Sequence, residues 1–259
     1  MFNRHKTTEF DKLYDKIANL YYLQKSNLQA ATIHPHTFLE YRGINTNKSV
    51  AVIGCGPTLK YYTMLKDVYH IGVNRAFLAK NVKLDALFIQ DFLLSDSDDM
   101  SLANDYRRDK CTKFYGIIPE HRFSQLKNVK RLSNQDICNA NAKIFMLEDA
   151  KCHNFAQHLE IEPIGDFCGC IFSALQFALF TNPKKLYLIG CDCSNLGHFH
   201  QERQCVVNGS DLSYQFESWK LFKQFADKFY PGTEIISVNP VGLAGLFNDI
   251  YTKNYKEST

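Results

Sequence analysis

Short runs of apolar, mostly β-branched residues alternate with longer helical stretches along most of the chain. Each run is short enough for one strand and has no helical periodicity. The expected strands are 49–53, 68–73, 84–89, 113–118, 143–147, 185–189 and 234–238. Nearly continuous apolar strands that alternate with helices are typical of a parallel sheet with helices on both faces. The pattern therefore predicts an α/β fold with a doubly wound, mostly parallel sheet.

Three helices stand out from this alternation. Residues from about Glu9 to Ala31 carry apolar side chains at helical spacing, and a polar connector follows at 34–47. The segment Phe167–Phe180 is apolar nearly all round, and 214–230 has an aromatic face that suits a buried core. We predict an N-terminal helix and connector over 1–48, with a packing role, and a Rossmann-like nucleotide-binding domain over 49–259.

Composition narrows the class of protein. The 259 residues are 45% hydrophobic and 14% aromatic, which is enough for a buried core. Thirty basic and 27 acidic residues give a charge of +3, too balanced to predict a nucleic-acid partner. The chain starts without a signal-peptide pattern, and its longest apolar stretch is shorter than the ~20 residues that span a bilayer. We expect a cytoplasmic protein with at most peripheral contact at the inner membrane face, and the oligomeric state, a homo-oligomer included, is left open.

The first strong strand runs into the turn Gly54-Cys55-Gly56-Pro57-Thr58. Glycines let the backbone come close to a ligand, and Pro57 and Thr58 suit the first turn of a helix, whose N–H groups attract phosphate. The first strand-to-helix turn of a doubly wound sheet is also the usual ligand crevice. The alternative is a tight turn that needs glycine for its geometry alone. The pattern is neither a full dinucleotide fingerprint nor a Walker loop.

Two polar residues follow the next strands. Asn74 comes after the second strand and Asp91 after the third. Both therefore lie at the edge where open α/β sheets bind ligands. Asn74 can read a base or ribose, and Asp91 can hold a hydroxyl or a metal. Each can instead cap the following helix.

Four short motifs carry a family resemblance. They are Gly54–Lys60, Gly72–Phe77, Asp166–Ala174 and Lys185–Asp192. Together they resemble the motifs of bacterial family-42 sialyltransferases and the related domain of motility accessory factors. The same superfamily includes an archaeal hydroxymethylpterin diphosphokinase. The similarity extends over about 49–247, which is nearly all of the predicted sheet.

The resemblance implies a nucleotide in the Gly54 turn, near Asn74, with Gly169 at a helix N-terminus that faces a phosphate or a sugar carboxylate. In the resembled families, a segment that corresponds to 239–242 also contacts the nucleotide. Cys168 aligns with the serine of a Thr-Ser-Gly motif. The candidate nucleotide-binding residues are Gly54, Cys55, Gly56, Pro57, Thr58, Asn74, Asp91, Cys168, Gly169, Asn239 and Gly242.

The catalytic candidates lie in one loop after a predicted strand. The sialyltransferases carry a late histidine as general base, but the comparable segment 211–215 has none, and their arginine before Thr-Ser-Gly is also missing. Asp192, His198 and His200 follow the strand at 185–189. A histidine titrates near the pH at which it can take a hydroxyl proton. We predict His198 or His200 as the base, oriented by Asp192; the alternative is an ordinary surface loop.

Nine cysteines in a chain of this size predict free thiols in a reducing compartment. A zinc site is the alternative, and its ligands would be Cys168, Cys170, Cys191, Cys193, His198 and His200. Structural zinc sites space paired cysteines by two to four residues, whereas these pairs are separated by one. The spacing favours packed thiols and no metal.

The resulting function is transfer of a sugar, such as a sialic-acid-like nonulosonate, from a CMP-linked donor to a cell-surface glycan or glycoprotein. No Asp-x-Asp metal motif follows a strand, so no cofactor is required. One alternative is ATP-dependent diphosphate transfer, with Asp91 and Asp192 holding Mg²⁺. Another is a nucleotide-binding accessory protein without turnover.

Overall fold

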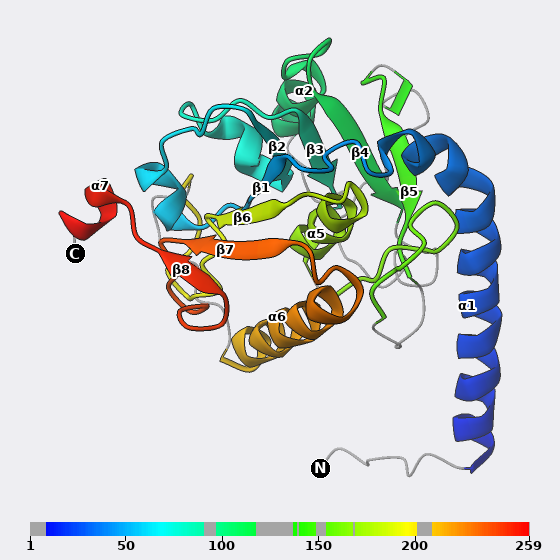
Figure 1. Ribbon diagram of the computed structural model, residues 1–259. Coiled ribbons are helices and arrows are strands. Elements are labelled where there is room, and N and C mark those ends of the chain that lie inside the picture. Colours follow the sequence, from blue (N-terminus) through cyan, green and yellow to red (C-terminus); the bar gives the residue numbers. More distant parts are fainter. Residues whose placement is uncertain are drawn as a thin grey trace.

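A single parallel sheet forms the centre of the molecule (Figure 1). The computed structural model describes residues 9–90, 97–117, 137–138, 140–148, 154–167, 169–200 and 209–258. Within these residues the strands are β1 (Ser49–Ile53), β2 (Val68–Val73), β3 (Ala86–Ile89), β4 (Thr112–Ile117), β5 (Lys143–Met146), β6 (Lys185–Ile189), β7 (Glu234–Val238) and β8 (Asn248–Ile250). They are hydrogen-bonded in the order β5-β4-β3-β2-β1-β6-β7-β8, with every neighbouring pair parallel. The predicted parallel α/β sheet is confirmed.

Helices cover both faces of this sheet. The α-helices of the described residues are α1 (Glu9–Phe38), α2 (Ser97–Asp105), α5 (Cys170–Phe180), α6 (Gly209–Phe229) and α7 (Lys253–Lys256). The 3₁₀ helices are η1 (Leu39–Tyr41), η2 (Pro57–Tyr61) and η3 (Asn74–Leu78). Figure 1 shows α5 and α6 on one face and α2 with the η2–η3 region on the other. The helix predicted at 167–180 thus begins three residues later, and the one predicted at 214–230 begins five residues earlier.

The strand order reverses between β1 and β6. From β1 the chain adds β2, β3, β4 and β5 on one side, and then returns to place β6 on the other side of β1. The two strands are in register to their ends, where Ile53 pairs with Ile189. The turns after β1 and β6 therefore emerge side by side. This is the topological switch point at which open α/β sheets bind ligands.

Two apolar cores lie on opposite faces of the sheet. Val50 and Val52 of β1 belong to the core with α5 and α6, whereas Ala51 and Ile53 belong to the other. This alternation follows from the two-residue period of a strand. Because both sets are fully buried, β1 is apolar along its whole length. Burial of this kind fixes the register of β1, and with it the position of the turn at Gly54.

Helix α1 continues farther than its sequence predicts. We expected a polar connector from residue 34, but the helix runs through Pro35 to Phe38. The Thr37 hydroxyl donates to the Ile144 carbonyl over 2.6 Å, and the buried Phe38 ring stacks on Phe114. These contacts with the sheet offset the helix bond that Pro35 cannot make. Figure 1 shows the opposite end of α1 projecting away from the body.

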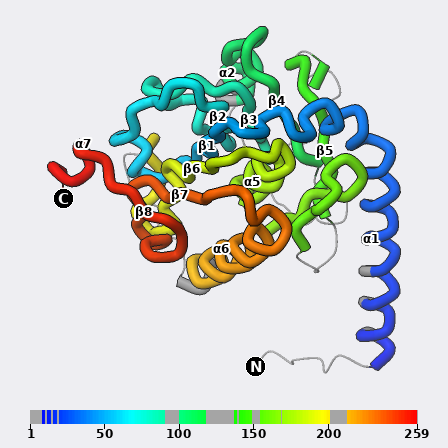
Figure 2. The backbone as a smooth tube through the Cα atoms, in the orientation of Figure 1, coloured from blue at the N-terminus to red at the C-terminus, as the bar shows by residue number. Residues whose placement is uncertain are grey.

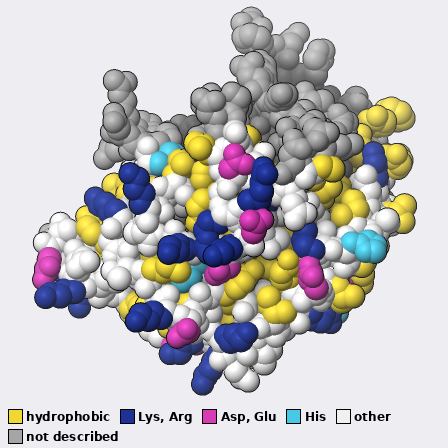
Figure 3. All heavy atoms as spheres, turned by 90° about the horizontal axis from the view of Figure 1, so that it is seen from above, with side chains coloured by type: hydrophobic (Ala, Val, Ile, Leu, Met, Phe, Trp, Pro, Cys, Tyr) yellow, Lys and Arg dark blue, Asp and Glu magenta, His cyan; other side chains and the backbone are white. Residues whose placement is uncertain are grey.

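The C-terminal edge of the sheet differs from the prediction. Strand β8 has three residues and no apolar alternation, so its sequence gave no strand signal. It pairs with β7 and leads to α7, which Figure 2 shows on the opposite side of the molecule from α1. On the face seen in Figure 3, basic and acidic side chains are interspersed with apolar ones. Among the described residues, no helix combines the length and the apolar character needed to cross a membrane.

Candidate functional site

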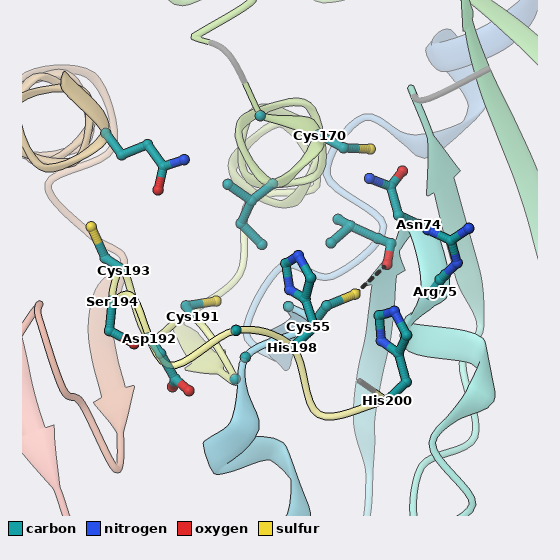
Figure 4. Close-up of a pocket in the computed structure, with 18 of the residues that line it drawn as sticks. Cys55, Asn74, Arg75, Cys170, Cys191, Asp192, Cys193, Ser194, His198 and His200 are labelled. Atoms are coloured by element: carbon teal, nitrogen blue, oxygen red, sulfur yellow. Dashed lines mark hydrogen bonds between the residues drawn. The ribbon is translucent and has the colours of Figure 1, made fainter. Parts of the chain in front are cut away.

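A cavity of about 300 Å³ opens at the carboxyl ends of β1 and β6. Four stretches of chain form its walls: the turns after β1 and β2, the start of α5, and the loop after β6 (Figure 4). Helix α6 adds Gln215 and Trp219. The lining residues predicted from the sequence are Gly54, Cys55, Gly56, Asn74, Gly169, Asp192, His198 and His200. The cavity thus brings together most of the candidate residues, although nucleotide binding by them stays a prediction.

The turns after β1 and β6 touch each other at glycines. The Gly54 N–H donates to the Ile189 carbonyl and the Gly56 N–H to the Gly190 carbonyl, each over 2.8 Å. A Cβ on Gly54 would lie 2.4 Å from the Gly190 oxygen, and one on Gly56 would lie 2.5 Å from Asp192 Cγ. Side chains at these positions would collide with the neighbouring turn. The glycines are therefore required by packing between the turns, and the two N–H groups are already used.

The Thr58 and Asp192 side chains join the same two turns. The Thr58 N–H donates to Asp192 Oδ2 over 2.9 Å, and the Thr58 hydroxyl donates to Asp192 Oδ1. Asp192 is buried, and this burial raises the pKa of its carboxyl above the usual value, while the hydrogen bonds from Thr58 act in the opposite direction. Both Thr58 donors are directed at Asp192. Thr58 lies within the following 3₁₀ helix at Pro57–Tyr61, whose N-cap is Gly56, and no side chain caps that helix.

The element after the Gly54 turn is also shorter than expected. The sequence predicts an α-helix here, but η2 is a five-residue 3₁₀ helix. The Asn81 amide donates to the carbonyls of Leu59 and Tyr62, over 3.1 and 2.8 Å. A longer helix would need those carbonyls for its own hydrogen bonds. The helix dipole expected at this turn is consequently weak, since it grows with the number of aligned peptides.

The two histidines form one wall of the cavity. Their rings are nearly parallel, with centroids 5.5 Å apart. The residue between them anchors the loop, because the Phe199 N–H donates to the Cys55 carbonyl over 2.9 Å and its ring packs against the core. Figure 4 shows the Asp192 carboxylate directed away from both imidazoles. To orient a histidine as predicted, Asp192 would have to contact one of the rings, but its carboxylate bonds to Thr58 instead.

Asn74 and the start of α5 form the side of the cavity opposite the two histidines. Asn74 has a left-handed backbone with φ of 45°, and its Oδ1 accepts from the Gln90 N–H over 3.4 Å. Gly169 precedes the first turn of α5 and has no close neighbour around its Cβ position, the nearest atom being 3.7 Å away. Unlike Gly54 and Gly56, Gly169 is thus free of tight packing. Its place at the N-terminus of an eleven-residue helix is electrostatically suited to an anion.

Arg75 is a lining residue that the sequence reasoning missed. It follows Asn74 at the end of β2 and adds a cation to the cavity wall (Figure 4). Its position two residues after the end of β2 was the available signal. The missed lining residues with polar or aromatic groups are Arg75, Ser194, Gln215 and Trp219.

Of the six other predicted residues, four lie outside this lining. Asn239 uses its amide on Thr252, donating to its hydroxyl over 3.0 Å and accepting from its N–H over 2.8 Å. Gly242 lies against the β6 loop, where a Cβ would be 2.0 Å from the Cys193 oxygen. Pro57 and Thr58 lie behind the turn and outside the cavity lining. Asp91 and Cys168 are outside the described residues.

Several thiols also border the cavity. Cys55 Sγ donates to the Val73 carbonyl over 3.4 Å, and Cys170 Sγ to the Phe88 carbonyl over 3.3 Å. Burial raises the pKa of Cys191 well above its usual value and that of Cys193 to about 11. Neither of these two is an activated thiolate. Among the described residues, no three or more His, Cys, Asp or Glu side chains are arranged to hold a metal ion.

Comparisons with known proteins give a match in fold. No family model matches the sequence, nor does any curated protein. The MAf glycosyltransferase from Magnetospirillum magneticum AMB-1 matches with a TM-score of 0.51 and 8% identity, over 90% of this chain and 38% of that one. This chain shares the fold of a glycosyltransferase. At the level of fold, the resemblance predicted from the motifs is confirmed.

Two sialyltransferase structures match more weakly. CstII from Campylobacter jejuni, solved with the substrate analogue CMP-3FNeuAc, has a TM-score of 0.41 and 16% identity. A CST-II structure with a trisaccharide acceptor and CMP has a TM-score of 0.43 and 16% identity. Each match covers 73% of this chain and 80% of the other. The present chain spans well under half of the MAf protein, whose whole activity therefore does not transfer from the fold alone.

Proposed function

We propose that this chain is an inverting glycosyltransferase. It moves a sugar of the nonulosonate class from a CMP-linked donor to a hydroxyl of a cell-surface glycan or glycoprotein. The observation that carries the proposal is the pair of histidines, His198 and His200, on the wall of a cavity at the switch point of the sheet. The choice of CMP and of the sugar class rests on the motif resemblance.

The donor phosphate is assigned to the α5 side of the cavity. On the β1 side, the N–H groups of Gly54, Gly56 and Thr58 are directed at the neighbouring turn. On the other side, α5 begins at the cavity with Gly169 as its cap, and no side chain caps it. Arg75 adds a guanidinium whose planar donors suit a phosphate or a carboxylate. A phosphate at this position would be stabilised by both.

The reaction assigned to the histidines is a single displacement. The acceptor oxygen attacks the anomeric carbon while the bond from that carbon to the phosphate oxygen breaks and CMP leaves. The acceptor proton passes to an imidazole nitrogen, which must come within about 2.6–3.2 Å of the hydroxyl. Attack from the side opposite the leaving phosphate inverts the anomeric carbon. Positive charge from Arg75 and the α5 terminus stabilises the leaving group.

Direct binding followed by turnover tests the proposal. Calorimetric titration with CMP, UDP, GDP and ATP, with and without Mg²⁺, should show preference for CMP. A CMP-sugar should then release CMP, and release should increase when an acceptor glycan is added. Preferential binding of ATP with Mg²⁺, without CMP release, would instead support the diphosphokinase alternative. The present contacts do not favour it, because both Asp192 oxygens accept from Thr58.

A further inference from the structure

The N-terminal half of α1 carries a row of large apolar side chains that the described part of the chain leaves uncovered. Their exposed fractions lie between 55% and 75%. We call this row the α1 stripe, and it consists of Phe10, Leu13, Tyr14, Ile17, Leu20, Tyr21 and Leu28. Steps of three, four and seven residues keep all of them on one side of the helix. The stripe extends over about five turns, or roughly 27 Å.

The α1 stripe is not an extension of the face that packs on the body. In the C-terminal half of the helix, Ala30 and His34 are completely buried against the body. Five turns, or about 18 residues, earlier on the same side lie Lys12 and Lys16, both exposed. Leu28 precedes Ala30 by two residues, which is about 200° around the helix. The stripe therefore faces nearly opposite to the body, and folding the helix down would bury lysines instead.

The body also stands apart from this end of the helix. In Figure 1, the lower half of α1 lies to one side of all the other helices and strands and does not overlap any of them. Isolated helices of such length are marginally stable in water, and most helical stability in proteins comes from packing of an apolar face. A projecting helix that is apolar on its outer side therefore requires a partner to cover that side.

We propose that this partner is the α1 stripe of a second copy of the chain, in a two-fold symmetric dimer. Apolar residues separated by alternating steps of three and four are typical of a seam between two helices. A self-complementary face of this kind closes on itself in a dimer. If the second copy covered all seven side chains, roughly 700 Å² would be buried per copy, close to the ~800 Å² per partner of a standard interface.

The charges on the same segment favour a second copy over a lipid surface. Residues 9–28 carry three acidic and three basic side chains, so the segment is neutral. Helices that lie on membranes carry mostly Lys and Arg on their polar side, to attract anionic lipids. A neutral segment has no such attraction, and it does not repel its own copy. This inference does not depend on the proposed glycosyl transfer.

Oligomeric state measured in solution tests the inference. The full chain should have a mass near twice 29.9 kDa by light scattering, falling toward the monomer on dilution over roughly a hundredfold range. The double variant Ile17→Glu/Leu20→Glu should be a monomer throughout. Lys12→Gln/Lys16→Gln changes the other side of the same turns, adds the same net negative charge as the double glutamate variant, and is the matched control, which should remain a dimer. At protein concentrations low enough for every protein to be a monomer, the unfolding midpoints of the variants should stay close to that of the wild type.

Three outcomes would overturn the dimer. The wild-type chain could be a monomer at every concentration. The double glutamate variant could remain a dimer, which would place the interface elsewhere. The wild-type monomer could instead sediment with vesicles of phosphatidylcholine and phosphatidylglycerol while the glutamate variant does not, and the occupant would then be lipid.

Discussion

The Asp192 carboxylate accepts both the backbone N–H and the hydroxyl of Thr58, 134 residues away in sequence. This contact ties the turn after β1 to the turn after β6, the two strands at which the sheet reverses its order. The cavity lies between those turns and α5. Its shape therefore depends on a pair that does not itself need to touch a ligand.

Replacing Thr58 by Val should destabilise the protein by about 1–3 kcal/mol, because the hydroxyl donor is lost and a buried carboxylate oxygen is left unpaired. Thr58→Ser keeps the hydroxyl and should stay near wild type. Urea unfolding at neutral pH measures both. Since burial raises the pKa of Asp192, Asp192→Asn should cost less than Thr58→Val. Equal stability of the Val and Ser variants would show that this hydrogen bond has no structural role.

Adding a methyl group at Gly56 should disturb the fold and the site together. In Gly56→Ala the new Cβ would lie 2.5 Å from Asp192 Cγ and 2.7 Å from the Gly190 oxygen, so a backbone turn must shift. We expect a loss of about 1–3 kcal/mol in the free energy of unfolding. Gly232→Ala is the control, because nothing lies within 4 Å of that position. Thermal unfolding compares them, and a neutral Gly56→Ala variant would contradict the packing between the turns.

The sheet could be predicted from the sequence almost strand by strand. The strands at Ser49–Ile53, Val68–Val73, Lys185–Ile189 and Glu234–Val238 have the expected ends. Each is an apolar run bounded by polar or turn residues, so burial alone defines it. The N-terminal boundary at residue 48 stays a prediction, although α1 itself extends past its expected end.

The details of the site depend on contacts that no local pattern contains. The end of η2 depends on Asn81, which lies 22 and 19 residues beyond the carbonyls it binds. Likewise, the glycine turn at 54–56 resembles a phosphate cradle in sequence, but the Gly54 and Gly56 N–H groups donate to the carbonyls of Ile189 and Gly190. Sequence reasoning identified the sheet edge correctly because strand direction determines that edge. It could not determine which donors there remain available.

Acid should weaken the junction between α1 and the sheet at His34. Burial lowers the pKa of His34 to about 4, and its neutral ring bonds at both nitrogens: Nδ1 with the Leu159 carbonyl and Nε2 with the Met146 N–H, over 2.9 and 2.8 Å. The unfolded chain binds the proton at about 6.5. The stabilisation is therefore complete above pH 6.5 and is lost as the pH falls toward 4, by about 3 kcal/mol.

Urea midpoints for wild type and His34→Gln between pH 4 and 7.5 measure this effect. The variant lacks the titrating ring, so its stability should fall less steeply below pH 6.5. The exposed His158→Gln variant should follow the wild-type curve. Parallel pH dependence of the wild type and His34→Gln would assign acid sensitivity to another group.

The catalytic role of the histidines can be separated from donor binding. If His198 or His200 takes the acceptor proton, replacing the active one by Ala should lower turnover by ~10²–10⁴-fold while the Kd of CMP changes little. The fold should remain intact, because the loop is anchored through the Phe199 backbone and ring. The assay is CMP release from the donor across pH, beside calorimetric binding. His158→Ala is the matched control and should retain full turnover.

The two variants together also distinguish the role of each ring. Because the imidazoles are stacked, the histidine that is not the base can still influence the other, and its loss should shift the pH profile rather than abolish turnover. Asp192→Asn should leave the pH profile unchanged, since both oxygens of Asp192 contact Thr58. If both histidine variants keep wild-type turnover and pH profile, the base lies elsewhere or the protein transfers no sugar.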